Sequence, residues 1–274
     1  MSNIANKPLL ILSIFAPSEH NSLWYDLQRR FIRKTTTVDY DYGLFLNGIP
    51  PVEFESAHVL NHSETNEGHK AALARLLSYA RQHPYYDNYL FLDSDCFPVG
   101  ENWYAELTGQ MKRFNKTIAA PVRVENLDLF PHPCAVLIAR EEIHNERIDF
   151  RDDISIKNML GIEVSDVGSA MYGMDEVMPL LRTNVVNVDP VAAAIYHHMF
   201  YHHGAGSRAF NFRITNRYRY YDHWWRSDDK EQVAKYLLRN LERNPDKFFN
   251  MLMGNRANLI QRMWGRFLYP YCFF

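Results

Sequence analysis

The chain has 274 residues, of which 47% are hydrophobic and 23% charged, and its formal net charge is −2. This composition suits one α/β domain with a small appendage, and a charge so near zero argues against a nucleic-acid-binding surface. The three cysteines Cys96, Cys134 and Cys272 are widely spaced and predict free thiols, and no apolar run approaches the roughly 20 residues that span a bilayer, so we expect a cytoplasmic protein.

The N-terminal part alternates short apolar runs with amphipathic segments. Residues 8–15 and 42–46 are predicted strands, and residues 23–33 have the apolar spacing of a surface-packed helix. The first strand leads into the loop Ala16-Pro17-Ser18, and the second ends in the turn signal Asn47-Gly48. In an open α/β sheet, loops that follow strands reach the ligand crevice.

A short strand at 58–60 is followed by a polar loop and a second predicted helix. The loop contains Asn66 and Gly68, and the helix begins near His69 and Lys70. A helix N-terminus beside a polar loop presents free backbone N–H groups that suit an anion or a ribose. The alternative is that these residues simply cap the helix.

The next apolar run, from Tyr89, ends in Asp93-Ser94-Asp95. It reads as a buried strand of a mostly parallel sheet, with both aspartates on one side of its carboxyl end. Two carboxylates about 4 Å apart repel by roughly 4 kcal/mol at an effective dielectric near 20. A bound Mg²⁺ or Mn²⁺ would remove this penalty; the alternative is a pair of solvated turn aspartates.

Further along, a helix is predicted over 101–114 and strands over 117–124, 133–139 and 185–188. Asp166, in the run Asp166-Val-Gly168, can cap a following helix.

The segment 195–208 contains four histidines, His197, His198, His202 and His203. On a strand, His197 and His203 share one face and His198 and His202 the other; on a helix, His198 and His202 pair at i, i+4. Arg208, after two glycines, can hold a phosphate with two hydrogen bonds.

The strand that ends in Asp93-Ser94-Asp95, followed by Phe97 and Pro98, resembles the DxD motif of GT-A fold glycosyltransferases. The polar loop and Ala-rich helix before it, the Asp-x-Gly element and the histidine-rich segment are similar to the same family, so the likeness covers roughly residues 8–210. The resemblance implies a Rossmann-like α/β fold with a mostly parallel central sheet flanked by helices. We expect a catalytic domain at 1–212 and a helical, aromatic-rich appendage at 213–274.

The family pattern also assigns roles to individual residues. Asp93 would serve the donor ribose and the metal shell, and Asp95 would ligate an Mn²⁺ or Mg²⁺ that bridges the donor diphosphate. His203 is the preferred further metal ligand, with His202 as the substitute. The residues implied to line the donor site are Ala16, Pro17, Asn47, Asn66, Gly68, His69, Lys70, Asp93, Ser94, Asp95, Ser207 and Arg208.

The implied reaction moves a hexosyl or pentosyl group from a UDP- or GDP-linked sugar to a hydroxyl of a glycan or another acceptor. Asp166, preferred to Asp152, Asp153 and Glu163, would be the general base, which implies inversion. Two alternatives stay open: a HAD-like phosphotransferase, although that family has Thr or Val where this chain has Phe97, and a non-catalytic nucleotide- or sugar-binding module. The aromatic C-terminal region can pack on the sheet domain, touch a membrane surface or form a dimer.

Overall fold

The computed structural model describes residues 7–18, 20–54, 58–123, 129–150, 154–158, 161–184, 194–204 and 238–254. The predicted strand at 185–188, the predicted ligands Ser207 and Arg208, the rejected candidates Asp152 and Asp153, and Cys272 lie outside this part of the chain.

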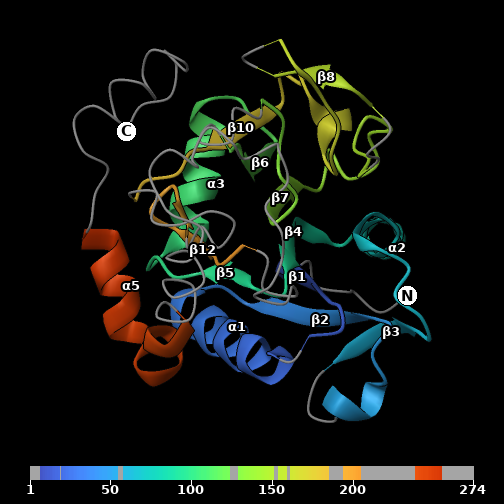
Figure 1. The fold of residues 1–274 in the computed structure, drawn as a ribbon. Helices are drawn as coiled ribbons and strands as arrows, with labels where there is room; N and C mark the ends of the chain where they lie inside the picture. Colours follow the sequence, from blue (N-terminus) through green and yellow to red (C-terminus); the bar gives the residue numbers. More distant parts are fainter. Residues whose placement is uncertain are drawn as a thin grey trace.

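A seven-stranded sheet forms the centre of the molecule (Figure 1). Its strands are β1 (Lys7–Phe15), β2 (Tyr40–Asn47), β3 (Val59–Ser63), β4 (Tyr86–Asp93), β6 (Ile118–Pro121), β7 (Ala135–Ala139) and β10 (Val177–Leu180). Their spatial order is β10-β6-β7-β4-β1-β2-β3. Neighbours pair in parallel except β7, which is antiparallel to both β4 and β6. The predicted α/β class with a mostly parallel sheet is confirmed.

Helices cover both faces of this sheet because the side chains of each buried strand alternate. Leu10 and Leu12 of β1 share a core with α2 (His69–Gln82), whereas Leu9 and Ile11 share one with α3 (Trp103–Arg113). The apolar side of α1 (Asn21–Thr35) packs with β2 on the face opposite α2. Each large apolar side chain that is fully buried contributes about 1.5–3 kcal/mol.

A three-stranded sheet continues from the end of β4 and holds the histidine-rich segment. It contains β5 (Cys96–Pro98), β12 (Phe200–His202) and β11 (Ala194–Tyr196), in the order β11-β12-β5 with antiparallel pairing. His202 is paired with Cys96 in this register. The segment is therefore a hairpin rather than a helix, and His197 and His198 lie in its turn.

Shorter elements complete the described part: η1 (Pro51–Phe54), β8 (Ile156–Lys157) paired with β9 (Glu163–Val164), η3 (Ser169–Met171) and α5 (Pro245–Gly254). Asp166 precedes a 3-10 turn and not the predicted helix. Its side chain accepts from the N–H of Val167 at 2.9 Å, and its backbone carbonyl accepts from the N–H of Ser169 at 3.0 Å.

The described part of the C-terminal region docks on α1. Asp246 of α5 forms ion pairs with Arg30 and Lys34, and the ring of Phe249 lies 4.8 Å from that of Phe31. The division into a domain at 1–212 and an appendage at 213–274 stays a prediction. Among the described residues, no helix has the length and apolarity needed to cross a membrane.

Candidate metal and donor site

The two aspartates stand where the central sheet gives way to the small sheet. Asp93 is the last residue of β4, Ser94 and Asp95 form a turn, and β5 follows. The side chain of Asp93 is 18% exposed and that of Asp95 is 7% exposed. Two carboxylates so little hydrated need a cationic partner.

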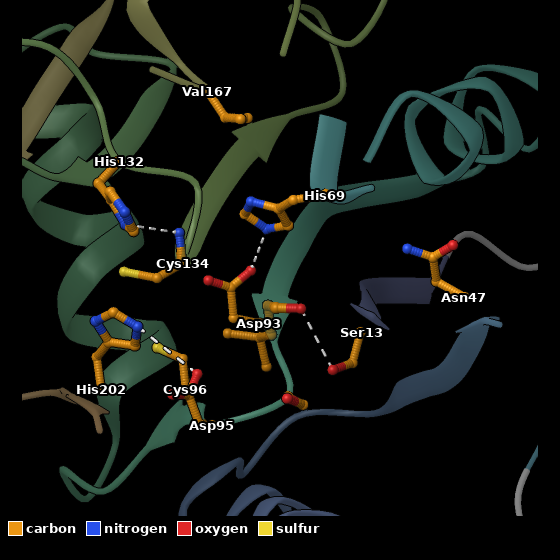
Figure 2. Close-up of polar contacts among 12 residues, drawn as sticks. Ser13, Asn47, His69, Asp93, Asp95, Cys96, His132, Cys134, Val167 and His202 are labelled. Carbon is orange, nitrogen blue, oxygen red and sulfur yellow. Dashed lines mark hydrogen bonds and ion pairs between the residues drawn. The ribbon is translucent and has the colours of Figure 1, made fainter. Parts of the chain in front are cut away.

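His202 supplies a third candidate ligand to this corner (Figure 2). Its Nε2 lies 3.6 Å from Oδ1 of Asp95, and one ligand atom each from Asp93, Asp95 and His202 lie within 4.8 Å of one another. Atoms bound to one ion at about 2.1 Å are at most about 4.2 Å apart, so small side-chain adjustments bring the three into coordination distance. Two carboxylates and an imidazole fit Mn²⁺, and the carboxylates alone fit Mg²⁺.

His202 and His203 have opposite surroundings, and the geometry favours His202 as the ligand in place of the predicted His203. His203 is 2% exposed, its Nδ1 lies 2.7 Å from the Tyr201 hydroxyl, and its ring packs 4.8 Å from that of Trp24. Its side chain thus belongs to the core on the α1 side. Its backbone N–H bonds to the turn that carries the aspartates, at the carbonyl of Asp95.

His69, at the start of α2, contacts Asp93. Its Nε2 lies 2.7 Å from Oδ1 of Asp93 (Figure 2). Burial would raise the pKa of Asp93, but His69 together with His202 and His132 holds that pKa well below its ordinary value. Burial also opposes the charge of His69, and Asp93 outweighs this and raises the pKa of His69. A carboxylate has two oxygens, so Asp93 can accept from His69 and still face a cation.

Sequence reasoning missed His132 and its contact with Cys134. The Nδ1 of His132 accepts from the backbone N–H of Cys134 at 3.3 Å, and its ring lies 5.6 Å from that of His202. Because β7 runs antiparallel to β4, its beginning lies at the edge where β4 ends. The sequence feature that could have indicated a site role for His132 is its position directly before the predicted strand 133–139. Cys96 and Cys134 are buried free thiols, as predicted.

Asn47 organises the donor-side loop. Its Nδ2 donates to Oδ1 of Asn66 at 2.9 Å and to the carbonyl of Gly68 at 3.2 Å. Its Oδ1 accepts from the hydroxyl of Ser63 at 3.2 Å and from the N–H of Glu67 at 2.8 Å. These four bonds use both donors and both lone pairs of the amide, so Asn47 supports the loop that carries Asn66 and Gly68, and its own contact with a donor stays a prediction.

The other predicted donor residues lie at several places around this corner of the sheet. Asn66 and Gly68 lie at the N-terminus of α2 beside His69, and Gly68 has a φ of 88°, which side-chain-bearing residues rarely adopt. Ala16, whose carbonyl accepts from Asn21, and the exposed Pro17 follow β1. The remaining predicted residues are Ser94, buried between the two aspartates, and Lys70, exposed on α2.

Asp166 lies near enough to His69 for its charge to raise the pKa of that histidine. Its Oδ2 lies 3.3 Å from Arg123. An arginine partner favours the ionised carboxylate, which can accept a proton, although it weakens the base. The next residue but one, Gly168, has a φ of 98°, and a Cβ there would lie 2.1 Å from the carbonyl oxygen of Pro131. Glycine is therefore required behind this carboxylate.

Comparison with known proteins identifies similar solved structures but no protein family that matches the chain. No protein-family model matches the chain, and no curated protein sequence matches it. Similar solved structures include the mannosyltransferase PcManGT from Pyrobaculum calidifontis, in complex with GDP-Man and Mn²⁺, at 10% identity and a TM-score of 0.41. That match covers 98% of this chain and 89% of the other.

Two further similar structures are bacterial. TarS 1–349 from S. aureus matches at 10% identity and a TM-score of 0.39, and GlyE from Streptococcus pneumoniae TIGR4 at 13% and 0.37. The matches cover 53% and 52% of this chain, and they span about half of the TarS fragment (51%) and about a third of GlyE (36%). At these values the likeness does not assign an activity, and function has to be argued from the residues of the site.

Proposed function

We propose that this protein is a metal-dependent glycosyltransferase that moves a sugar from a nucleoside diphosphate sugar to an acceptor hydroxyl, with inversion at the anomeric carbon. The observation that carries the proposal is the convergence of Asp93, Asp95 and His202 within 4.8 Å at the carboxyl end of β4. In an open α/β sheet this edge is where ligands bind.

Asp93, Asp95 and His202 would hold Mn²⁺ or Mg²⁺. The cation, when bound, supplies positive charge to the diphosphate leaving group. His69 keeps Asp93 ionised and oriented through the 2.7 Å contact between its Nε2 and Oδ1 of Asp93. The N-terminus of α2, with Asn66 and Gly68 before it, would offer backbone N–H groups to the donor. Ser207 and Arg208 remain proposed diphosphate ligands.

Asp166 would accept the proton of the acceptor hydroxyl as sugar transfer proceeds. Its ion pair with Arg123 keeps the carboxylate charged before the reaction. A general base contributes about 10²–10⁴-fold to a rate. An Asp166→Asn variant is therefore expected to lose that much in kcat while its Kd for the donor changes little.

The proposal is tested by calorimetric titration of UDP- and GDP-linked sugars with and without Mn²⁺, on the parent protein and on Asp95→Asn. The expected result is metal-dependent donor binding that Asp95→Asn loses. Asp87→Asn is the matched control, because Asp87 lies on β4 and pairs with Arg140, near the opposite end of that strand. Equal metal-dependent binding by Asp95→Asn and the parent protein would refute the site.

The same protein preparations separate the two rival functions. Hydrolysis of phosphomonoesters without a sugar nucleotide would indicate a phosphotransferase. Metal-dependent donor binding without transfer or hydrolysis, over a panel of glycan acceptors, would indicate a binding module.

A further inference from the structure

Gln28 is a fully buried amide on the apolar side of α1. It is 0% exposed, between Leu27 and Phe31 in sequence and with Trp24 one turn earlier on the helix. A leucine or methionine would suit such a core position. A buried amide is costly unless its donors and acceptor are all paired, so the partners of Gln28 explain why the residue is there.

The nitrogen of this amide bonds to the turn that carries both aspartates. Nε2 donates to the backbone carbonyl of Asp93 at 2.9 Å and to that of Cys96 at 2.8 Å. A longer bond of 3.4 Å joins the same nitrogen to the carbonyl of Ser94. Carbonyl oxygens only accept, so the nitrogen must be the atom that faces them. One side chain thereby connects the two ends of the segment from β4 to β5.

The oxygen of the same amide is held from β2. The hydroxyl of Tyr42 donates to Oε1 of Gln28 at 2.5 Å. Burial raises the pKa of Tyr42 well above its ordinary value, so the hydroxyl keeps the proton that it donates. Gln28 is therefore oriented at both ends of its amide, because a flipped amide would place its oxygen against carbonyl oxygens and lose these bonds.

Other contacts secure the rest of the turn. The carbonyl of Leu92 accepts from the hydroxyl of Ser13 at 3.3 Å, the N–H of Asp93 donates to Cys134, and the carbonyl of Asp95 accepts from His203. Each of these bonds reaches one residue between Leu92 and Asp95. Gln28 alone among the described side chains bonds to the carbonyls at both Asp93 and Cys96.

We propose that Gln28, oriented by Tyr42, is a positioning residue that sets the spacing and direction of the Asp93 and Asp95 carboxylates toward a divalent cation. This inference rests on the proposed function, because it assumes that the turn binds metal. A ligand set must be held within about 0.5 Å of its productive geometry, and partners outside the ligand shell supply that accuracy.

The test measures Mn²⁺ affinity in Gln28→Met, Tyr42→Phe and Asp95→Asn, with Mn²⁺ alone and again with UDP or GDP present. Free Mn²⁺ is followed by electron paramagnetic resonance, and the frozen-solution spectrum of the bound ion reports its coordination. Gln28→Met keeps the volume and removes every hydrogen bond of the amide. Thr35→Val is the matched control: Thr35 is also buried on α1, but its hydroxyl bonds chiefly to the carbonyl of Phe31 in its own helix, at 2.8 Å.

We expect Gln28→Met to weaken Mn²⁺ binding about 10- to 100-fold and to alter the spectrum of the bound ion. Tyr42→Phe should weaken Mn²⁺ binding too, but by less, and Thr35→Val should lower the melting temperature with Mn²⁺ affinity unchanged.

Normal affinity and an unaltered spectrum in Gln28→Met, with binding lost in Asp95→Asn, would overturn the positioning role while the metal site stands. If Gln28→Met does not fold, unchanged affinity in Tyr42→Phe overturns it. Equal Mn²⁺ affinity in Asp95→Asn and the parent protein would overturn both proposals.

Discussion

At the scale of single residues, His202 at the end of β12 and His203 directly after it differ most in what surrounds them. Burial would lower the pKa of His202, but Cys134 and Asp95 raise it to about 9, so a cation that binds here displaces a proton from this ring. Burial, with the charge of His202, lowers the pKa of His203 to about 3, so His203 is neutral. The alternation of a strand separates the two. Sequence reasoning named both and preferred His203, because the pairing of His202 with Cys96 cannot be read from the sequence.

We predict that His202→Gln abolishes Mn²⁺ binding and that His203→Gln leaves it within a few-fold of the parent value. The second variant should instead lower the melting temperature, because it disturbs the contacts with Tyr201 and Trp24 in the core. Mn²⁺ titration and thermal unfolding of both variants check this. Loss of binding in His203→Gln with retention in His202→Gln would return the ligand role to His203.

At the scale of elements, long periodic segments were predictable and short strands were not. The predicted helices at 23–33 and 101–114 correspond to α1 and α3, and the first two strands to β1 and β2. The strands β5, β11 and β12 have three residues each, too few for a periodic pattern. The antiparallel direction of β7 also had no signal in its sequence, which is an apolar run like that of a parallel strand.

The hairpin between β11 and β12 turns through two histidines in the left-handed region. His197 and His198 have φ values of 53° and 57°, and the N–H of Met199 donates to the carbonyl of Tyr196 at 2.8 Å. We predict that His198→Val destabilises the protein by about 1 kcal/mol although the residue is exposed, because β-branched residues fit this region poorly. His198→Asn should lie within about 0.5 kcal/mol of the parent. Urea unfolding checks both, and equal stability of the Val and Asn variants would contradict the assigned turn.

The contact between α5 and α1 should weaken in acid. Lys34 and Arg30 lower the pKa of Asp246 below its ordinary 3.8, so the stability that this carboxylate contributes is present above pH 3.8 and is lost as pH falls through the lowered pKa. The pair is largely exposed, so we expect Asp246→Asn to cost under about 1 kcal/mol at pH 7, and this cost should shrink as the pH falls below 3.8 through the lowered pKa of Asp246. Unfolding of both proteins over this range tests it; a constant difference at all pH values would rule out the ion pairs as the cause.

At the scale of the whole molecule, the α/β class was predictable because it follows from the order of apolar runs along the chain. The candidate site was predictable in part: the aspartates follow from the end of one strand, and His69 from the start of one helix. His132, Gln28 and the choice of His202 were not, since each depends on tertiary pairing between segments far apart in sequence.

Cation and donor binding should stabilise the entire domain, because the site joins β4, β12 and α2. At ligand concentrations of 100 times Kd, binding adds about 2.7 kcal/mol to the free energy of unfolding, or several degrees in Tm for a chain of this size. Thermal unfolding with Mn²⁺ and GDP or UDP checks the shift, and Asp95→Asn should not show it. An equal shift in that variant would place the ligand elsewhere.

The position of His202 on β12 has a consequence for how the protein is made. This imidazole is translated about a hundred residues after Asp95, yet the two lie side by side in the finished molecule. A nascent chain still on the ribosome therefore carries the acidic pair for some time before the histidine emerges from the exit tunnel. We expect chains arrested before residue 200 to retain Mn²⁺ far more weakly than released ones, so that the ion is acquired at the close of synthesis.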